Sequence, residues 1–220
     1  MPQLRYAQLR YLSIVLLAWA STFVLTRGAL LIAHWGDAGA SSVEIVRIFA
    51  VGLAYDATFL LYATLPLALY LLLCPHRVWR LRGHRVFLHL LLGISLFVML
   101  FTATAEWLFW DEFGVRFNFI AVDYLVYSEE VINNILESYP VYPLIAALAL
   151  MAVFLTLAMG RPLNRALGAP LMPHRTALGA WGLLLAGALL ATLAVNQNFP
   201  RGLGGNAYQN ELASNCLLYT

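Results

Sequence analysis

The sequence has no lysine and few charged residues of any kind. All 13 basic residues are arginine, and charged residues make up 11% of the 220-residue chain, whereas hydrophobic residues make up 62%. Soluble domains average about 25% charged and roughly 45–50% apolar residues. The composition therefore excludes an ordinary soluble domain and an intrinsically disordered chain. We expect a polytopic membrane protein.

Residues that build metal centres and redox pairs are also scarce. The two cysteines, Cys74 and Cys216, lie far apart and form no CxxC pair, so they give no metal or redox signal. The five histidines are scattered without HExxH spacing, and no phosphate-binding loop or nucleophile-elbow motif occurs. The sequence therefore predicts no metal site within this chain. We expect membrane lipids as its partners, and no nucleic acid.

Five apolar stretches are each long enough to cross a bilayer, which requires about 20 residues of helix. The predicted fold class is all-α, with five transmembrane helices forming a domain over residues 1–195. The expected spans are 11–33, 48–73, 86–105, 141–160 and 177–195.

The arginines predict the orientation of these spans. The N-terminal tail, the loop between spans two and three, and the loop between spans four and five contain nine arginines and no acidic residue. Cytoplasmic loops are enriched in arginine and lysine. We therefore expect a cytoplasmic N-terminus and a C-terminus on the outer side. A cleaved signal peptide ending near Ala18-Trp19-Ala20 is an alternative for the first span, although its apolar run is longer than a signal peptide requires.

The longest segment between spans, 106–140, is predicted to form an outer loop. Its first two thirds are rich in Trp, Phe and Tyr, which favour the interface between membrane and water. Its last third, from Ser128 to Tyr139, has apolar residues at helical spacing, with Ser128 as a candidate N-cap. We expect an amphipathic helix at the outer interface.

Two charged residues fall inside predicted spans. Arg27 lies six residues from the outer end of the first span, and Asp56 lies about eight residues from the outer end of the second. Charges in hydrocarbon are costly and need a partner. At 1.5 Å per residue the two lie about 9 and 12 Å deep, so an intramembrane pair is plausible. Such a pair either fixes helix packing or forms a polar site for a head group or ion.

The outer loop offers a second candidate site, for a lipid head group. Arg116 is the lone cation in this loop and is its best candidate for binding a phosphate. Carboxylates of the loop could do acid–base chemistry, or they could simply be solvated. The candidate residues of this head-group site are Arg116, Asn118, Asp123 and Tyr124.

After the fifth span, residues 196–220 are polar and glycine-rich, as is typical of a linker. We expect this segment to begin an extracytoplasmic linker.

Several segments resemble one family. They are Phe113–Tyr127, Glu130–Pro140, Asn206–Asn215, and Arg47 with the Tyr55-Asp56 pair. These segments are similar to the membrane half of lipoteichoic acid synthase-like proteins, phosphoglycerol transferases of the alkaline phosphatase/sulfatase superfamily. The resemblance is strongest to the proteobacterial members and implies a bacterial inner-membrane location.

The resemblance implies an activity that this chain would not perform alone. In such proteins a large extracytoplasmic domain follows the five helices. Its threonine nucleophile and divalent metal, usually manganese, transfer phosphoglycerol from phosphatidylglycerol to a glycan or polymer. After Asn215 the sequence departs from the family pattern, so the chain is expected to be an anchor fragment that lacks the catalytic domain and its metal. A phosphoethanolamine transferase or lipid-linked sulfatase is the related possibility.

Two functions of other classes remain open. A small transporter or channel is favoured by Arg27 and Asp56, but the odd helix count and the lack of an inverted repeat oppose it. A membrane scaffold subunit would use the amphipathic helix of 128–139 to bind a partner.

Overall fold

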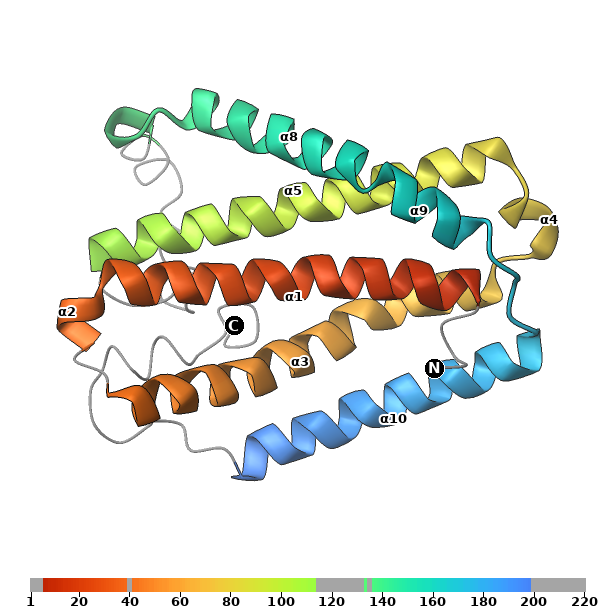
Figure 1. Ribbon diagram of the computed structural model, residues 1–220, viewed down its shortest axis with the longest axis horizontal. Helices are drawn as coiled ribbons and strands as arrows, with labels where there is room; N and C mark the ends of the chain where they lie inside the picture. The colour runs from red at the N-terminus through yellow and green to blue at the C-terminus, as the bar shows by residue number, and fades with distance from the viewer. Residues whose placement is uncertain (1–5, 39–40, 114–132, 134–135, 199–220) are drawn as a thin grey trace. The chain divides into compact units, whose positions relative to one another are not determined.

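The computed structural model describes residues 6–38, 41–113, 133 and 136–198. Within these ranges the secondary structure is helical, and no strand occurs. Figure 1 labels the elements. They are α1 (Ala7–Ala33), α2 (Trp35–Ala38), α3 (Ser42–Leu73), α4 (His76–Trp79), α5 (Arg82–Phe113), α8 (Val141–Ala158), α9 (Gly160–Leu167) and α10 (His174–Asn198).

The predicted all-helical fold is confirmed for the described residues, and five of the helices are long and apolar enough to cross a membrane. They overlap the five stretches expected from hydropathy, and several of them extend beyond the predicted ends. The candidate spans are Ala7–Ala33, Ser42–Leu73, Arg82–Asp111, Val141–Ala158 and His174–Leu193.

The start of α3 corrects the predicted second span, which was placed at residue 48. The helix begins at Ser42 because Ser41 caps it. The Ser41 backbone N–H donates to Glu44 Oε2 at 2.6 Å, and the Glu44 N–H donates to Ser41 Oγ at 3.4 Å. This reciprocal pair is a capping box, and its Ser-x-x-Glu spacing is visible in the sequence. Hydropathy alone missed it, since residues 42–47 include charged side chains.

The end of α5 corrects the predicted boundary between span three and the outer loop. Residues 106–113 were assigned to the loop, but the helix continues to Phe113. Glu106 and Trp110 are buried, with exposed fractions of 2% and 1%. They are four residues apart and therefore lie on one helix face. The polar Glu106 does not end the helix, because that face packs inward.

Residues 159–173 correct the predicted loop between spans four and five. The fourth span ends at Ala158, and the short helix α9 follows it. Leu163, Ala166 and Leu167 of α9 are buried, whereas Arg161 and Arg165 are exposed. This pattern makes α9 amphipathic.

The helices divide into two compact units. Unit 1 takes its described residues from Met1–Ser21, Ala57–Leu96 and Ala152–Phe199. Unit 2 takes its described residues from Thr22–Asp56 and Phe97–Met151. The long helices α1, α3, α5 and α8 each contribute one part to each unit.

Unit 1 is held together by an apolar cluster and by hydrogen bonds from aromatic side chains. Its buried cluster contains Ala68, Leu72, Met172 and Ala177. Tyr11 Oη donates to the Leu88 carbonyl at 2.8 Å, and Trp19 Nε1 donates to Ser95 Oγ at 3.2 Å. Trp181 Nε1 donates to the Leu65 carbonyl at 3.3 Å. In an apolar medium such bonds fix neighbouring helices, because the polar groups find no water.

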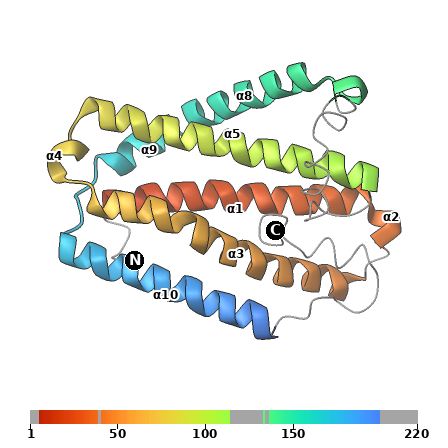
Figure 2. The ribbon, with the colours of Figure 1, turned by 180° about the vertical axis from the view of Figure 1, so that it is seen from behind.

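Within unit 1, the three arginine-bearing segments meet. The connection from α9 to α10 passes the first residues of α1, as Figures 1 and 2 show, and the Ala7 N–H donates to the Pro170 carbonyl at 2.9 Å. Trp79 Nε1 of α4 donates to the Leu167 carbonyl at 3.3 Å. The imidazole rings of His76 and His174 stack at 5.3 Å. The start of α1 and the connections at 74–81 and 159–173 therefore lie at one end of this unit.

Unit 2 contains a second buried apolar cluster. Leu30, Leu31, Ile48 and Trp110 form it, so α1, α3 and α5 all contribute. The ring of His34, just after α1, lies 5.4 Å from the Trp110 ring. The same unit holds the charged residues that the sequence placed inside the first two spans.

Candidate functional site: a buried ion pair in unit 2

Arg27 of α1 and Asp56 of α3 form a two-fold contact in unit 2. Arg27 Nη1 donates to Asp56 Oδ2 at 2.5 Å, and Nη2 donates to Oδ1 at 2.9 Å. The exposed fractions of the two residues are 0% and 2%. Parallel hydrogen bonds of this kind are the strong, geometrically specific form of an arginine–carboxylate contact. The structure thus brings together the two residues that the sequence analysis paired.

Gly52 makes room for the guanidinium group. It lies one turn before Asp56 on α3, and a Cβ added to it would lie 2.4 Å from both Cζ and Nε of Arg27. A glycine at this position therefore lets the arginine reach the carboxylate across the helix surface. The sequence analysis did not identify Gly52. Its position four residues before Asp56, on the same helix face, was the available signal.

The burial of this pair has an energetic consequence. Moving two charges out of water is costly, and the mutual attraction offsets that cost only when both partners are present. Removing one partner leaves an uncompensated charge in an apolar interior. The ion pair is therefore a buried polar contact that holds α1 against α3 in unit 2.

A third buried charged residue lies in the same unit. Glu106 of α5 is buried, and Tyr55, next to Asp56, is also buried, with an exposed fraction of 8%. Sequence reasoning placed Glu106 in the outer loop and so missed its burial. The continuation of the helical pattern through Trp110 could have revealed it.

The candidate head-group residues of the outer loop, Arg116, Asn118, Asp123 and Tyr124, lie outside the described residues. The predicted amphipathic helix at 128–139 lies largely outside them too. Of that segment, residues 133 and 136–139 are described. Residues 133 and 136–138 are helical and exposed, whereas Tyr139 lies in a bend and is partly exposed. The linker expected at 196–220 is described only as far as Asn198, where α10 ends.

Charge is strongly segregated between the sequence ranges of the two units. No aspartate or glutamate occurs in the ranges of unit 1, which contain nine of the 13 arginines. Eight of these arginines are described, and all eight are exposed. They are Arg10, Arg77, Arg80, Arg82, Arg85, Arg161, Arg165 and Arg175.

The described part of the chain contains no group of three or more His, Cys, Asp or Glu side chains able to hold a metal ion. Arg27 and Asp56 form a pair of opposite charge. Such a pair can fix the packing of two helices or recognise a polar group.

The fold and the buried pair define a helical protein with five candidate membrane spans. No family model matches the sequence. Comparison with curated proteins and comparison with solved structures also gave no match.

Proposed function

We propose that this chain is the membrane-anchor domain of an extracytoplasmic phosphoglycerol transferase similar to lipoteichoic acid synthase. In this proposal the chain sits in a bacterial inner membrane with its N-terminus in the cytoplasm. The enzyme takes phosphoglycerol from phosphatidylglycerol and modifies an envelope glycan or polymer. The anchor itself carries no catalytic residue.

The observation that carries the proposal concerns Tyr55 and Asp56. These adjacent residues belong to the family resemblance, and both are buried, with Asp56 held by Arg27. Burying an ion pair in a membrane span costs free energy. Such a pair therefore indicates a structural or a recognition role. Its coincidence with a segment of the resemblance favours the architecture of that family over an arbitrary helical bundle.

The number of spans also supports the proposal. If all five candidate spans cross the membrane, their odd number puts the two chain ends on opposite sides of it. With the arginine-bearing end of unit 1 in the cytoplasm, the segment after α10 lies on the outer side, where a sulfatase-like domain would act. The divalent metal of such an enzyme would be held by that domain and would polarise the phosphoryl oxygens.

Reading the coding sequence beyond codon 220, in all three frames, tests this proposal. We expect a frame that encodes a domain with a threonine nucleophile and an Asp/Glu/His set able to hold a metal. A stop without such a domain in any frame would contradict the proposal. The liposome flux of a small solute through the purified chain would then favour a transporter, for which the buried Arg27–Asp56 pair would be the first site to mutate.

A further inference from the structure

Two short helices of unit 1 each carry a pair of exposed arginines. Arg161 and Arg165 lie one turn apart on α9, and Arg77 and Arg80 lie three residues apart, on α4 and directly after it. Side chains at these spacings share one face of a helix. Each of the two helices therefore presents a pair of guanidinium groups on one side. These four residues are called the arginine surface.

Buried side chains hold the two helices together beneath these arginines. Trp79 of α4 is buried, and its Nε1 donates to the carbonyl of Leu167, the last residue of α9, at 3.3 Å. Leu163 and Leu167 of α9 are buried as well. Figures 1 and 2 show both helices at the same end of unit 1. The buried residues thus fix α4 and α9 in place, while the arginines stay exposed.

No carboxylate of unit 1 neutralises the arginine surface, because the sequence ranges of this unit contain no aspartate or glutamate. Like charges one turn apart on a helix repel each other and destabilise it. An anion bound between two such arginines removes that repulsion. Arginine binds phosphate oxygens through strong, charge-assisted hydrogen bonds. The arginine surface therefore fits a partner that carries phosphate groups.

The distance of the arginines from the candidate spans indicates what that partner is. Arg77 lies four residues after α3, Arg80 two residues before α5, and Arg161 three residues after α8. Head groups occupy a layer of about 5–8 Å outside the hydrocarbon core of a bilayer. Three to five residues of helix span about that length. With these spans in a membrane, the phosphate within reach of the arginine surface is that of a lipid.

We propose that the arginine surface binds two anionic phospholipids of the leaflet at this end of unit 1, one on each helix. Arg161 and Arg165 bind the phosphate of one lipid, and Arg77 and Arg80 bind the phosphate of its neighbour. Phosphoglycerol transfer would take place on the other side of the membrane, so this site does not depend on the proposed enzyme.

Native mass spectrometry of the whole chain tests this site. The protein is purified in mild detergent with equal amounts of phosphatidylserine and phosphatidylcholine that have the same acyl chains. Phosphatidylserine is anionic but has serine as its head group, so it is not a donor of phosphoglycerol. We expect two phosphatidylserine molecules to be retained per chain, about tenfold over phosphatidylcholine, because only the former carries a net negative charge. Equal retention of the two lipids, or retention of neither, would overturn the proposal.

Two double variants assign the lipids to the two helices. Arg161→Gln with Arg165→Gln should lose one of the two phosphatidylserine molecules, and Arg77→Gln with Arg80→Gln should lose the other. All four positions are exposed, so the helices keep their buried contacts. Retention of both lipids in either double variant would contradict the assignment.

A matched control separates this site from general attraction to a basic protein. Arg85→Gln with Arg175→Gln removes the same amount of charge from exposed positions of unit 1 and leaves both arginine pairs intact. It should retain both lipids. A loss as large as that in the other double variants would show diffuse attraction and overturn the proposal.

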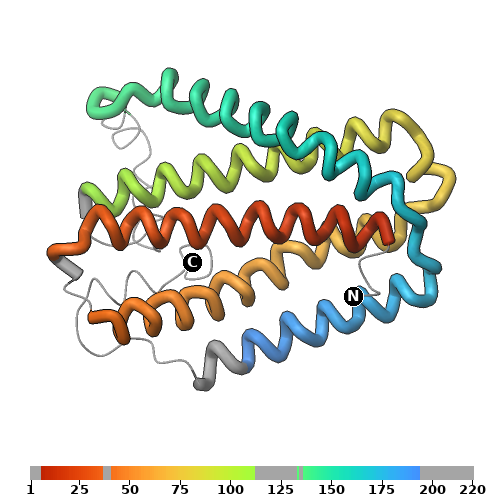
Figure 3. Tube along the Cα trace, in the orientation of Figure 1, coloured from red at the N-terminus to blue at the C-terminus, as the bar shows by residue number. Residues whose placement is uncertain are grey.

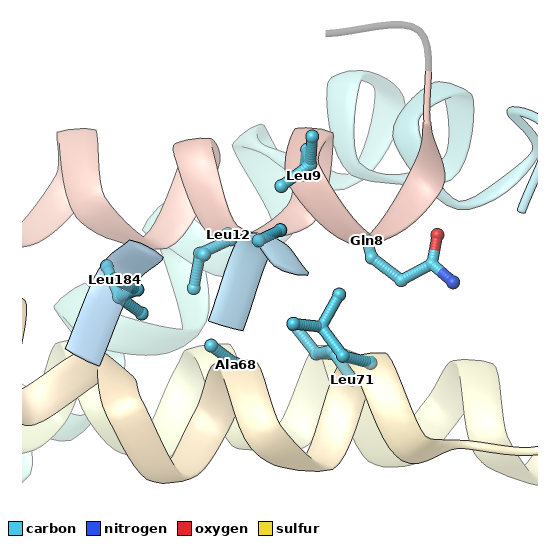
Figure 4. Close-up of a pocket in the computed structure, with 8 residues that line it drawn as sticks. Gln8, Leu9, Leu12, Ala68, Leu71 and Leu184 are labelled. Carbon is cyan, nitrogen blue, oxygen red and sulfur yellow. The ribbon is translucent and has the colours of Figure 1, made fainter. Parts of the chain in front are cut away.

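A further variant separates the arginine surface from an apolar cavity of unit 1. Figure 4 shows this cavity, which lies between α1, α3 and α10 and is lined by side chains such as Leu12, Ala68 and Leu184. None of the four arginines lines it. Ala180→Phe fills the cavity and should leave both lipids bound. Loss of lipid from this variant, with both arginine pairs intact, would place the lipid in the cavity and contradict the proposal.

Discussion

The guanidinium group of Arg27 lies directly over the backbone of Gly52. A Cβ built on that glycine would meet the Arg27 Cζ and Nε atoms at 2.4 Å, closer than any real contact allows. The glycine thus determines how α1 approaches α3 within unit 2. Because Asp56 lies one turn further along the same helix, the approach also determines whether the ion pair can form.

Gly52→Ala should therefore destabilise the protein. The added methyl group must displace a buried, hydrogen-bonded guanidinium, and overpacking of this kind costs about 1–3 kcal/mol. The free energy of unfolding in mild detergent measures the effect. Gly28→Ala is the matched control, because a Cβ at Gly28 would have no neighbour within 4 Å. That change should be neutral or stabilising by up to about 1 kcal/mol through helix propensity. Equal effects of the two changes would contradict the packing described here.

A double-mutant cycle should show strong coupling between Arg27 and Asp56. Arg27→Met and Asp56→Leu should each lower the free energy of unfolding by about 3–5 kcal/mol, because each leaves a single buried charge. The double variant should lose less than either single variant, since it buries no charge. Additive losses would show that the two side chains do not act as a pair.

Cys74 should be a poorly reactive thiol at neutral pH. It lies just after α3 and is buried, and burial raises its pKa above the ordinary thiol value. The thiolate is the reactive form, so the rate of maleimide labelling should stay low at neutral pH and rise only in alkaline solution. Stability contributed by the protonated thiol should be present below the unfolded-state pKa and be lost as the pH rises through the higher folded-state pKa.

The labelling rate is measured against pH in a Cys216→Ser background. The exposed position Val78, changed to cysteine in a variant that lacks both native cysteines, is the control. Cys74 reacting as fast as the control at neutral pH would contradict its burial.

Cysteine labelling at three exposed positions tests on which side of the membrane the arginine-bearing end of unit 1 lies. Arg80, Asn164 and Asp111 are all exposed. In a cysteine-free background, Asp111→Cys should react with a membrane-impermeant maleimide in intact cells. Arg80→Cys and Asn164→Cys should react only after the membrane is permeabilised. Labelling of Arg80→Cys and Asn164→Cys from opposite sides would contradict the contact between α4 and α9.

Hydropathy was sufficient to predict the five spans, because about 20 consecutive apolar residues have few other uses. It also predicted the Arg27–Asp56 contact, since two charges at similar depth in neighbouring spans have few other partners. It did not predict the polar helix ends. The first turns of α3 depend on the capping box of Ser41 and Glu44, and the last turns of α5 depend on a packed face that includes Glu106. Backbone hydrogen bonding continues there regardless of hydropathy, and Figure 3 traces both helices through these turns.

The burial of Gln8 could not be predicted from the sequence either. Its burial depends on α10 and on the backbone of Met172, which is 164 residues away along the chain. Contacts at such separations leave no periodic pattern in the residues themselves.

Transfer of glycerol phosphate from labelled phosphatidylglycerol is the direct test of whether this chain anchors a phosphoglycerol transferase. Membranes are used from cells that express this chain together with the coding sequence that follows codon 220. We expect label to move to a glycan or polymer fraction and a chelator of divalent metal to stop the transfer. Transfer of phosphoethanolamine, or no transfer by an intact, membrane-inserted product, would contradict this role.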